Sequence, residues 1–179
     1  MTELFKSIFG SLQKAFLEKL SSEARIKYLR KKGVRIGQDC HIDTMLFSTE
    51  PFLIEIGNHV AISSGTQFIT HDGSVWCMQE EVDGQVFGKI KIGNNVFIGI
   101  NCTILYNTSI GDNCIIGAGS VVRGHFPDNS VIFGNPARVF LKTDILKMMF
   151  LHNPGLLKTN NLRFSKAEKI IKNHFGTDK

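Results

Sequence analysis

One histidine of this 179-residue chain stands at a place suited to proton transfer. His71 lies in the segment QFITHDGSVW, where a regular apolar repeat ends and an irregular segment begins. An imidazole titrates near neutral pH, so a histidine held there can take a proton from a hydroxyl or an amine. His71 is therefore the candidate general base, and a loop histidine bonded only to backbone is the alternative.

Two neighbours of His71 are candidates to support it. Asp72 is placed to orient the imidazole, although a plain turn at Asp72-Gly73 explains the same residue equally well. Trp76, the single tryptophan, suits stacking on a sugar ring or on part of a cofactor, and it equally suits anchoring this segment against another subunit.

Three acids in the same segment are candidates to position His71 or to bind hydroxyl groups of a substrate, with a solvated acidic loop as the alternative. These acids are Glu80, Glu81 and Asp83.

The residues on both sides of this segment repeat every six positions, a period that matches neither an α-helix nor an uninterrupted strand. A large apolar residue occupies the same place in each unit, glycine often follows it, and a small residue comes four positions later. The apolar positions are Ile56, Ile62, Phe68, Ile92, Ile98, Ile104, Ile110, Ile116 and Val122, with Ile36 and Ile42 as an earlier, offset pair. Each unit predicts one short strand and one tight corner, so that three units close a turn of about 18 residues and the turns stack around a column of isoleucines.

The repeat defines the regions of the chain. A helical cap is expected over 1–32, because apolar residues recur there at helical spacing and Ser21 offers a second helix start. The repeat region is expected over 33–141, interrupted by a loop insertion over 72–90 that does not fit the hexapeptide pattern.

A helical extension is expected over 142–179, with helices at 143–151 and 165–175 on either side of Pro154-Gly155. Basic residues gather at both ends of the chain, since 1–35 carries nine Lys or Arg and three acids, 141–179 carries eight and three, and 36–140 carries four and ten. Capping of the repeat is the expected role of the first helix, and peripheral contact of the basic terminal helices with a membrane is the alternative.

Several localisations and partners are not expected. No apolar run reaches the about 18 residues that cross a bilayer, and the first residues do not resemble a signal peptide, which together favour a cytoplasmic protein. No nucleic-acid motif accompanies the basic residues, so nucleic acid is not an expected partner.

The stretch IKIGNNVFIGINCTILYNTSIGDNCIIGAGSVV and the later FGNPARVF resemble the hexapeptide-repeat acyltransferases, in particular the maltose and galactoside O-acetyltransferases and the capsule or O-antigen acetyltransferases. The resemblance covers roughly residues 24–141. It implies a mainly β fold, a left-handed parallel β-helix of hexapeptide repeats with N- and C-terminal helices. It also implies a homotrimer with active sites between neighbouring subunits, acetyl-CoA as co-substrate, and a sugar or nucleotide sugar as acceptor.

The same resemblance implies roles for particular residues. The family's catalytic histidine precedes its loop, and His71 matches it by position and context. Acetyl-CoA is expected along the outside of the coils, at positions that match family contacts: Ile100, Ala118, Arg123, Arg138 and Lys142. The last three are cationic and suit the phosphates of the cofactor. The chain departs from the family at Tyr106-Asn107, where many relatives have Pro-Gly.

Other functions stay open at this point. One alternative is N-acetylation of a nucleotide-linked amino sugar, for which the same coils are suited. A second alternative is a non-catalytic scaffold, which would use the coils only for binding. A metal enzyme of the γ-carbonic-anhydrase type needs three converging histidines, two of them at a short fixed spacing, and the sequence has no such pair. We therefore expect no metal. The cysteines lack metal-ligand spacing too, and three of them, Cys40, Cys102 and Cys114, fall at small positions of the repeat.

Overall fold

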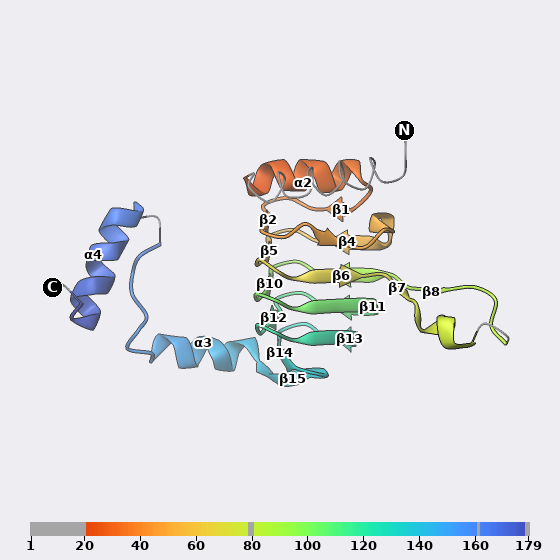
Figure 1. Cartoon of the computed structure of the whole chain (residues 1–179). Coiled ribbons are helices and arrows are strands. Elements are labelled where there is room, and N and C mark those ends of the chain that lie inside the picture. The colour runs from red at the N-terminus through yellow and green to blue at the C-terminus, as the bar shows by residue number, and fades with distance from the viewer. Residues whose placement is uncertain (1–20, 79–80, 161, 178–179) are drawn as a thin grey trace. The chain divides into compact units, whose positions relative to one another are not determined.

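Short strands follow one another around a coil, and the coils stack into a parallel β-helix (Figure 1). The computed structural model describes residues 21–78, 81–160 and 162–177. The helices of these residues are α2 (Ser22–Lys31), α3 (Thr143–Leu151) and α4 (Phe164–Phe175), with 3-10 turns η1 (Pro51–Leu53) and η2 (Ser74–Met78). The strands are β1 (Arg35–Ile36), β2 (His41–Ile42), β3 (Leu46–Phe47), β4 (Ile54–Ile56), β5 (Val60–Ile62), β6 (Gln67–Ile69), β7 (His71–Asp72), β8 (Val86–Phe87), β9 (Ile90–Ile92), β10 (Val96–Ile98), β11 (Thr103–Ile110), β12 (Ile115–Ile116), β13 (Val121–Phe126), β14 (Ser130–Gly134) and β15 (Ala137–Lys142).

The strands form three walls. One wall stacks β2, β5, β10, β12 and β14 in parallel, and the long strand β11 turns a corner, so that its first half pairs with β6 and its second half with β9. Phe97 lies beside Ile115 of the next coil, eighteen residues further on, which is the predicted length of a turn. Val60 lies beside Val96 instead, thirty-six residues on, because the insertion adds the length of a second coil before the repeat resumes.

The apolar ladder of the repeat fills the interior of the coils, as predicted. Ile56, Ile62, Phe68, Ile92, Ile98, Ile104, Ile110, Ile116 and Val122 are all buried. Burial of each such side chain stabilises the fold by about 1.5–3 kcal/mol. Two of the small positions hold Cys102 and Cys114, which are buried as expected, while Cys77 of the insertion is exposed.

The corners explain where glycine and asparagine recur. Asn95 and Asn113 have φ angles of 54° and 56°, in the left-handed region that asparagine tolerates. Gly93 serves a different purpose, because a Cβ atom there would lie 2.6 Å from the backbone of Gly111 in the next coil. Close stacking of the corners, rather than a positive φ angle, therefore requires that glycine.

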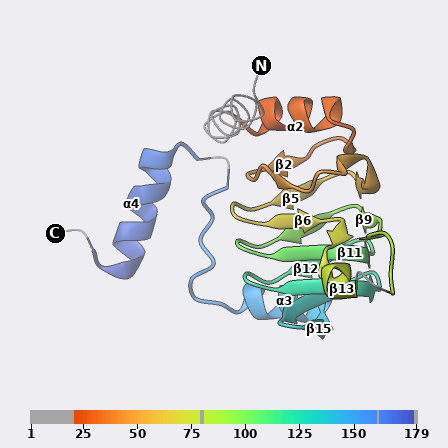
Figure 2. The same cartoon turned by 45° about the vertical axis from the view of Figure 1, so that its right-hand side comes forward.

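Helix α2 covers the end of the first coil, as Figures 1 and 2 show. Its N-cap is Ser21, the predicted helix start, and its buried residues Ile26 and Leu29 join the core of the coils. Ser22 Oγ accepts a hydrogen bond of 2.7 Å from the backbone N–H of Ile42, so a group at the open edge of the coil is satisfied. Residues 22–31 are helical and pack on the core of the coils; the cap expected over 1–32 stays a prediction, since residues 1–20 lie outside the described part.

The insertion leaves the coil after β6 and returns before β9. Its first and last residues pair as the antiparallel strands β7 and β8, with His71 opposite Phe87 and Asp72 opposite Val86. The backbone N–H of Gly88 donates to the carbonyl of Thr70 at 2.9 Å. Both ends of the insertion are thus fixed at one corner of the coil.

The chain divides into two compact units, the first ending at Thr143 and the second beginning at Asp144. The second unit contains most of α3 and all of α4, which confirms the two predicted helices, and neither helix has a buried residue. Along α4, Phe164, Ile171 and Phe175 recur at helical spacing, and Lys166, Lys169 and Lys172 lie on the opposite side. Contact of these basic helices with a membrane stays a prediction. No helix of the described residues is long and apolar enough to cross a bilayer.

Candidate active site

His71 begins strand β7 at the corner where the insertion leaves the coil. Its side chain is 36% exposed, so part of the imidazole is accessible while the backbone is held by strand pairing. The ring lies 6.0 Å from the ring of Phe87, measured between centroids, on the returning strand of the insertion. A rigid coil and an accessible ring are what a general base needs.

Two residues of the coil above lie within hydrogen-bond distance of His71 Nδ1: Glu50, and Ser48, whose Oγ is 3.2 Å away. Glu50 Oε2 lies 3.0 Å from His71 Nδ1, and Thr70 Oγ1 donates to the same oxygen at 2.7 Å. Hydrogen bonds to the carboxylate, the largest contribution from Thr49 and the next from Thr70, lower the pKa of Glu50 to about 2. Glu50 is thus ionised at neutral pH and favours a proton on Nδ1 of His71, which leaves Nε2 with the lone pair that a base uses.

Glu50 is the residue of the candidate site that the sequence analysis missed. Strand β3 pairs Phe47 with Phe68, and three positions further along both coils Glu50 comes opposite His71. The separation of Glu50 and His71 is twenty-one residues, whereas the regular repeat gives eighteen, since this first coil is longer. The sequence did contain a signal for this longer coil, because Ile36 and Ile42 are out of phase with the later six-residue repeat. That offset changes the register of the first coil, and with it the residue that comes opposite His71.

Asp72 does not bind the imidazole. Its carboxylate accepts hydrogen bonds from the Tyr106 hydroxyl at 2.7 Å and from the backbone N–H of Ser74 at 2.9 Å. These bonds, the one from Tyr106 first, lower the pKa of Asp72 to about 2. The bond to Ser74 is an Asx turn, so the turn explanation of Asp72 is the one that the structure matches, and Glu50 takes the orienting position.

The insertion forms a hollow of about 340 Å³ beyond Asp72. Trp76 and Asp83 line it, together with Gly73 and Val82. Trp76 is 75% exposed, and Glu81 is exposed but is not among the lining residues. Glu80 falls outside the described residues. Of the predicted substrate-binding residues, the structure therefore brings Trp76 and Asp83 together.

Two of the predicted cofactor positions stack on one another along a different corner. Ile100 and Ala118 are exposed and occupy equivalent places in successive coils, where the backbone N–H of Gly119 donates to the carbonyl of Ile100. The coil above contributes Ser64, whose carbonyl accepts from the backbone N–H of Asn101. We call this line of residues, Ser64, Ile100 and Ala118, the corner column.

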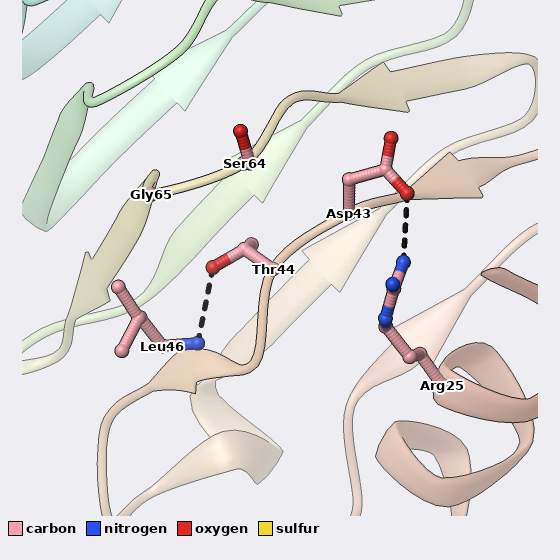
Figure 3. A pocket seen from close by; sticks show the side chains of 6 residues that line it. All are labelled: Arg25, Asp43, Thr44, Leu46, Ser64 and Gly65. Atoms are coloured by element: carbon pink, nitrogen blue, oxygen red, sulfur yellow. Dashed lines mark hydrogen bonds and ion pairs between the residues drawn. The ribbon is translucent and has the colours of Figure 1, made fainter. Parts of the chain in front are cut away.

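A hollow of about 480 Å³ lies at the α2 end of the corner column (Figure 3). Ser64 and Gly65 line it from the column, and Arg25 and Asp43 line it from α2 and the first coil. Arg25 is held by an ion pair of 2.7 Å with Asp43, and it also donates to the carbonyl of Ile42. The sequence pattern gave no sign of this hollow, because its residues come from three separate segments.

The three predicted phosphate contacts do not lie together. Arg138 pairs in register with Phe133, which packs directly below Gly117 of the corner column's last coil. Lys142 pairs with Ser130 at the other end of the same strand. Arg123 lies over the ring of Tyr106, with 4.2 Å between its guanidinium carbon and the ring centroid, at the corner below His71. Of the three, Arg138 is therefore the one at the end of the corner column.

The corner column and His71 occupy different corners of the coil. Ile100 lies just before β11, and Tyr106 follows the first three residues of that strand. These three residues form the wall between the two corners, which is about 10 Å long at the usual rise per strand residue. His71 lies at the Tyr106 corner, one coil above. A single chain thus leaves a strand between its histidine and its own corner column. Among residues 21–78, 81–160 and 162–177, no three His, Cys, Asp or Glu side chains form a group that could hold a metal ion.

Several known proteins are similar to this chain in sequence and in fold. Residues 89–124 match the family described as bacterial transferase hexapeptide (six repeats). Protein CapG of Staphylococcus aureus is 41% identical over 170 residues, which cover 92% of this chain and 96% of CapG. Galactoside O-acetyltransferase of Escherichia coli K12 is 33% identical over 108 residues, which cover 60% of this chain and 53% of that enzyme. The crystal structure of a maltose O-acetyltransferase from Clostridium difficile 630 is 25% identical, with a TM-score of 0.52, and the match covers 79% of this chain and 89% of that one.

The chain belongs to the hexapeptide-repeat transferase family, and it is an enzyme of the acyltransferase class. The predicted fold, a left-handed parallel β-helix with terminal helices, is confirmed.

Proposed function

We propose that this enzyme transfers an acetyl group from acetyl-CoA to a hydroxyl group of a sugar, with His71 as general base. His71 Nε2 takes the hydroxyl proton as the oxygen bonds to the thioester carbonyl; the carbon–sulfur bond then breaks and the thiol leaves with that proton. Glu50 stabilises the charged imidazole that forms between these steps. The observation that carries the proposal is the hydrogen bond of 3.0 Å between Glu50 and His71 at an accessible corner. The O-acetyltransferase names of relatives support a sugar hydroxyl as acceptor.

The test is an activity screen of the purified full chain. Thiol release from acetyl-CoA is measured against a panel of free sugars, nucleotide sugars and oligosaccharides, and the product is identified by mass spectrometry. We expect an acceptor-dependent release and an O-acetylated sugar. Release that does not depend on any of these acceptors would contradict the proposed acceptor class.

We further propose that the working unit is a homotrimer, with His71 of one chain facing the corner column of the next. The wall between the two corners supports this arrangement, because it separates each histidine from the column of its own chain, and in a closed ring of three copies the column of a neighbour can face it. If the threefold axis runs along the coils, His71 lies at the level of Ser64, and Ile100, Ala118 and Arg138 follow on lower coils. The acetyl end of acetyl-CoA then lies near Ser64 and the phosphates near Arg138. The hollow of Arg25 and Asp43 lies one coil above, where it can take the acceptor's hydroxyl groups.

Arg138 gives a quantitative expectation for cofactor binding. Loss of a charge-assisted contact to a phosphate costs about 1.4 kcal/mol or more, so Arg138→Ala is expected to raise the KM for acetyl-CoA about tenfold with little change in kcat. Lys142→Ala is the matched control, since Lys142 lies at the other end of β15 from Arg138, beside Ser130. Steady-state kinetics with varied acetyl-CoA measures both, and an unchanged KM in Arg138→Ala would remove Arg138 from the cofactor site.

A further inference from the structure

Tyr106 stands at the corner where the chain departs from the Pro-Gly of many relatives. Its side chain is only 7% exposed, although its hydroxyl reaches the insertion and donates to Asp72 Oδ2 at 2.7 Å. The guanidinium of Arg123 lies over the ring, with 4.2 Å between its carbon and the ring centroid. The ring is thus fixed by the coil, and the hydroxyl is fixed by a residue thirty-four positions earlier in the chain.

The carboxylate that Tyr106 binds is the first acid of the insertion. Asp72 follows His71 directly, and its second oxygen accepts from the backbone N–H of Ser74, where η2 begins. One carboxylate therefore joins the coil below to the first turn of the insertion. Because Asp72 also pairs with Val86 of the returning strand, this contact holds both ends of the insertion.

The contact is suited to hold across the physiological pH range. The hydrogen bond from Tyr106 lowers the pKa of Asp72 to about 2, and the same bond raises the pKa of Tyr106 above its ordinary value. The phenol therefore stays a donor and the carboxylate stays an acceptor around neutral pH. A hydrogen bond to an ionised acceptor is shorter and stronger than one between neutral groups.

We propose that Tyr106 is a positioning residue for His71: through Asp72 it holds the insertion so that the imidazole and the Trp76 hollow keep their places at the site. This role rests on the proposed function. A hydroxyl attacking a thioester tolerates little displacement of its base, since a misplacement of about 1 Å can cost a hundredfold in rate. Tyr106→Phe keeps the ring under Arg123 and removes the hydroxyl that binds Asp72, so kcat is expected to fall about tenfold, with a smaller change in the KM for acetyl-CoA.

A readout independent of activity is available, because Trp76 is the single tryptophan and lies in the insertion. In Tyr106→Phe we expect lower anisotropy of the Trp76 emission and faster proteolytic cleavage within residues 73–87. The matched control is Tyr28→Phe, which changes the other tyrosine, on α2, and is expected to leave both readouts unchanged. The melting temperature of each variant confirms that it is folded.

A double-mutant cycle completes the test. Asp72→Asn weakens the same bond from its other side, so the double variant is expected to be no more impaired in kcat or Trp76 anisotropy than the worse single variant. Unchanged Trp76 anisotropy and unchanged kcat in Tyr106→Phe, or additive effects in the cycle, would overturn the proposal. If the wild-type chain transfers acetyl to no acceptor, the proposed function fails, and the positioning role fails with it; the fluorescence and proteolysis readouts still show whether Tyr106 holds the insertion.

Discussion

Replacing His71 by alanine is expected to lower kcat for sugar acetylation by about 10²–10⁴-fold while acetyl-CoA still binds with nearly its original affinity. The reason is that the proposed cofactor contacts come from the corner column that His71 faces and not from His71 itself, so its removal takes away the base and none of those contacts. Thiol release measures kcat, and calorimetric titration with coenzyme A measures binding. His125→Ala is the matched control, because His125 is an exposed histidine on β13, away from Glu50.

The size of the kcat loss in His71→Ala also distinguishes O-acetylation of a sugar from N-acetylation of an amino sugar and from a non-catalytic scaffold. Normal turnover of His71→Ala with a confirmed sugar acceptor would contradict the role of general base. A weak loss would favour N-acetylation of an amino sugar, because an amine that is already deprotonated needs less help from a base. A scaffold without catalysis predicts no acceptor-dependent turnover in the wild-type chain.

Replacing Glu50 by glutamine is expected to lower kcat by about 10²-fold or more, because the neutral amide no longer stabilises the protonated imidazole and no longer selects the nitrogen that carries the proton. The pKa of Glu50 is about 2, so the residue is ionised at every pH of a usual assay, and its own titration adds no pH dependence to the loss from pH 6 to 9. Glu55→Gln is the matched control: Glu55 is also an acid on a coil, but its partner is the exposed Arg35. A wild-type kcat in Glu50→Gln would show that His71 works without the Glu50 carboxylate, and it would contradict the proposed role of Glu50.

The same carboxylate gives a stability expectation. Its pKa falls from an unfolded value of 4.5 to about 2 in the fold, so ionised Glu50 stabilises the folded state above pH 4.5, and this contribution is lost as the pH falls toward 2. The shift corresponds to an upper limit of about 3 kcal/mol. Chemical unfolding of the wild-type chain and of Glu50→Gln between pH 6 and 3 is expected to show a smaller acid-induced decline in the variant.

The coils were predictable from sequence because their signal is local and repeated. An isoleucine at every sixth position specifies an inward residue wherever it occurs, and Ile98, Ile104 and Ile110 obey the rule without reference to the rest of the chain. The place of His71 followed from the same pattern, since an interruption of the repeat marks where a side chain leaves the regular wall.

The partner of His71 was not predictable in this way, since the contact depends on the register between coils. Glu50 meets His71 because the first coil is longer than the regular turn, and the six-residue period carries no information on that length. The contact of Asp72 with Tyr106 likewise spans the insertion and one coil. The cofactor residues expected from the family resemblance do not share one corner either. Ile100 and Ala118 stack on one corner, but Arg123 lies on another, and the six-residue period does not show which corner a residue occupies relative to the others.

The shared site is tested most directly by mixing two variants that are each inactive. His71→Ala removes the base, and Ala118→Trp blocks the corner column at an exposed position. The two chains are coexpressed with different tags, and trimers that carry both tags are purified. Each mixed trimer then contains one interface with an intact histidine facing an intact column, so about one third of wild-type activity is expected. Mixed trimers as inactive as either parent, beside active trimers of two differently tagged wild-type chains, would show that each site lies within one chain and would contradict the account.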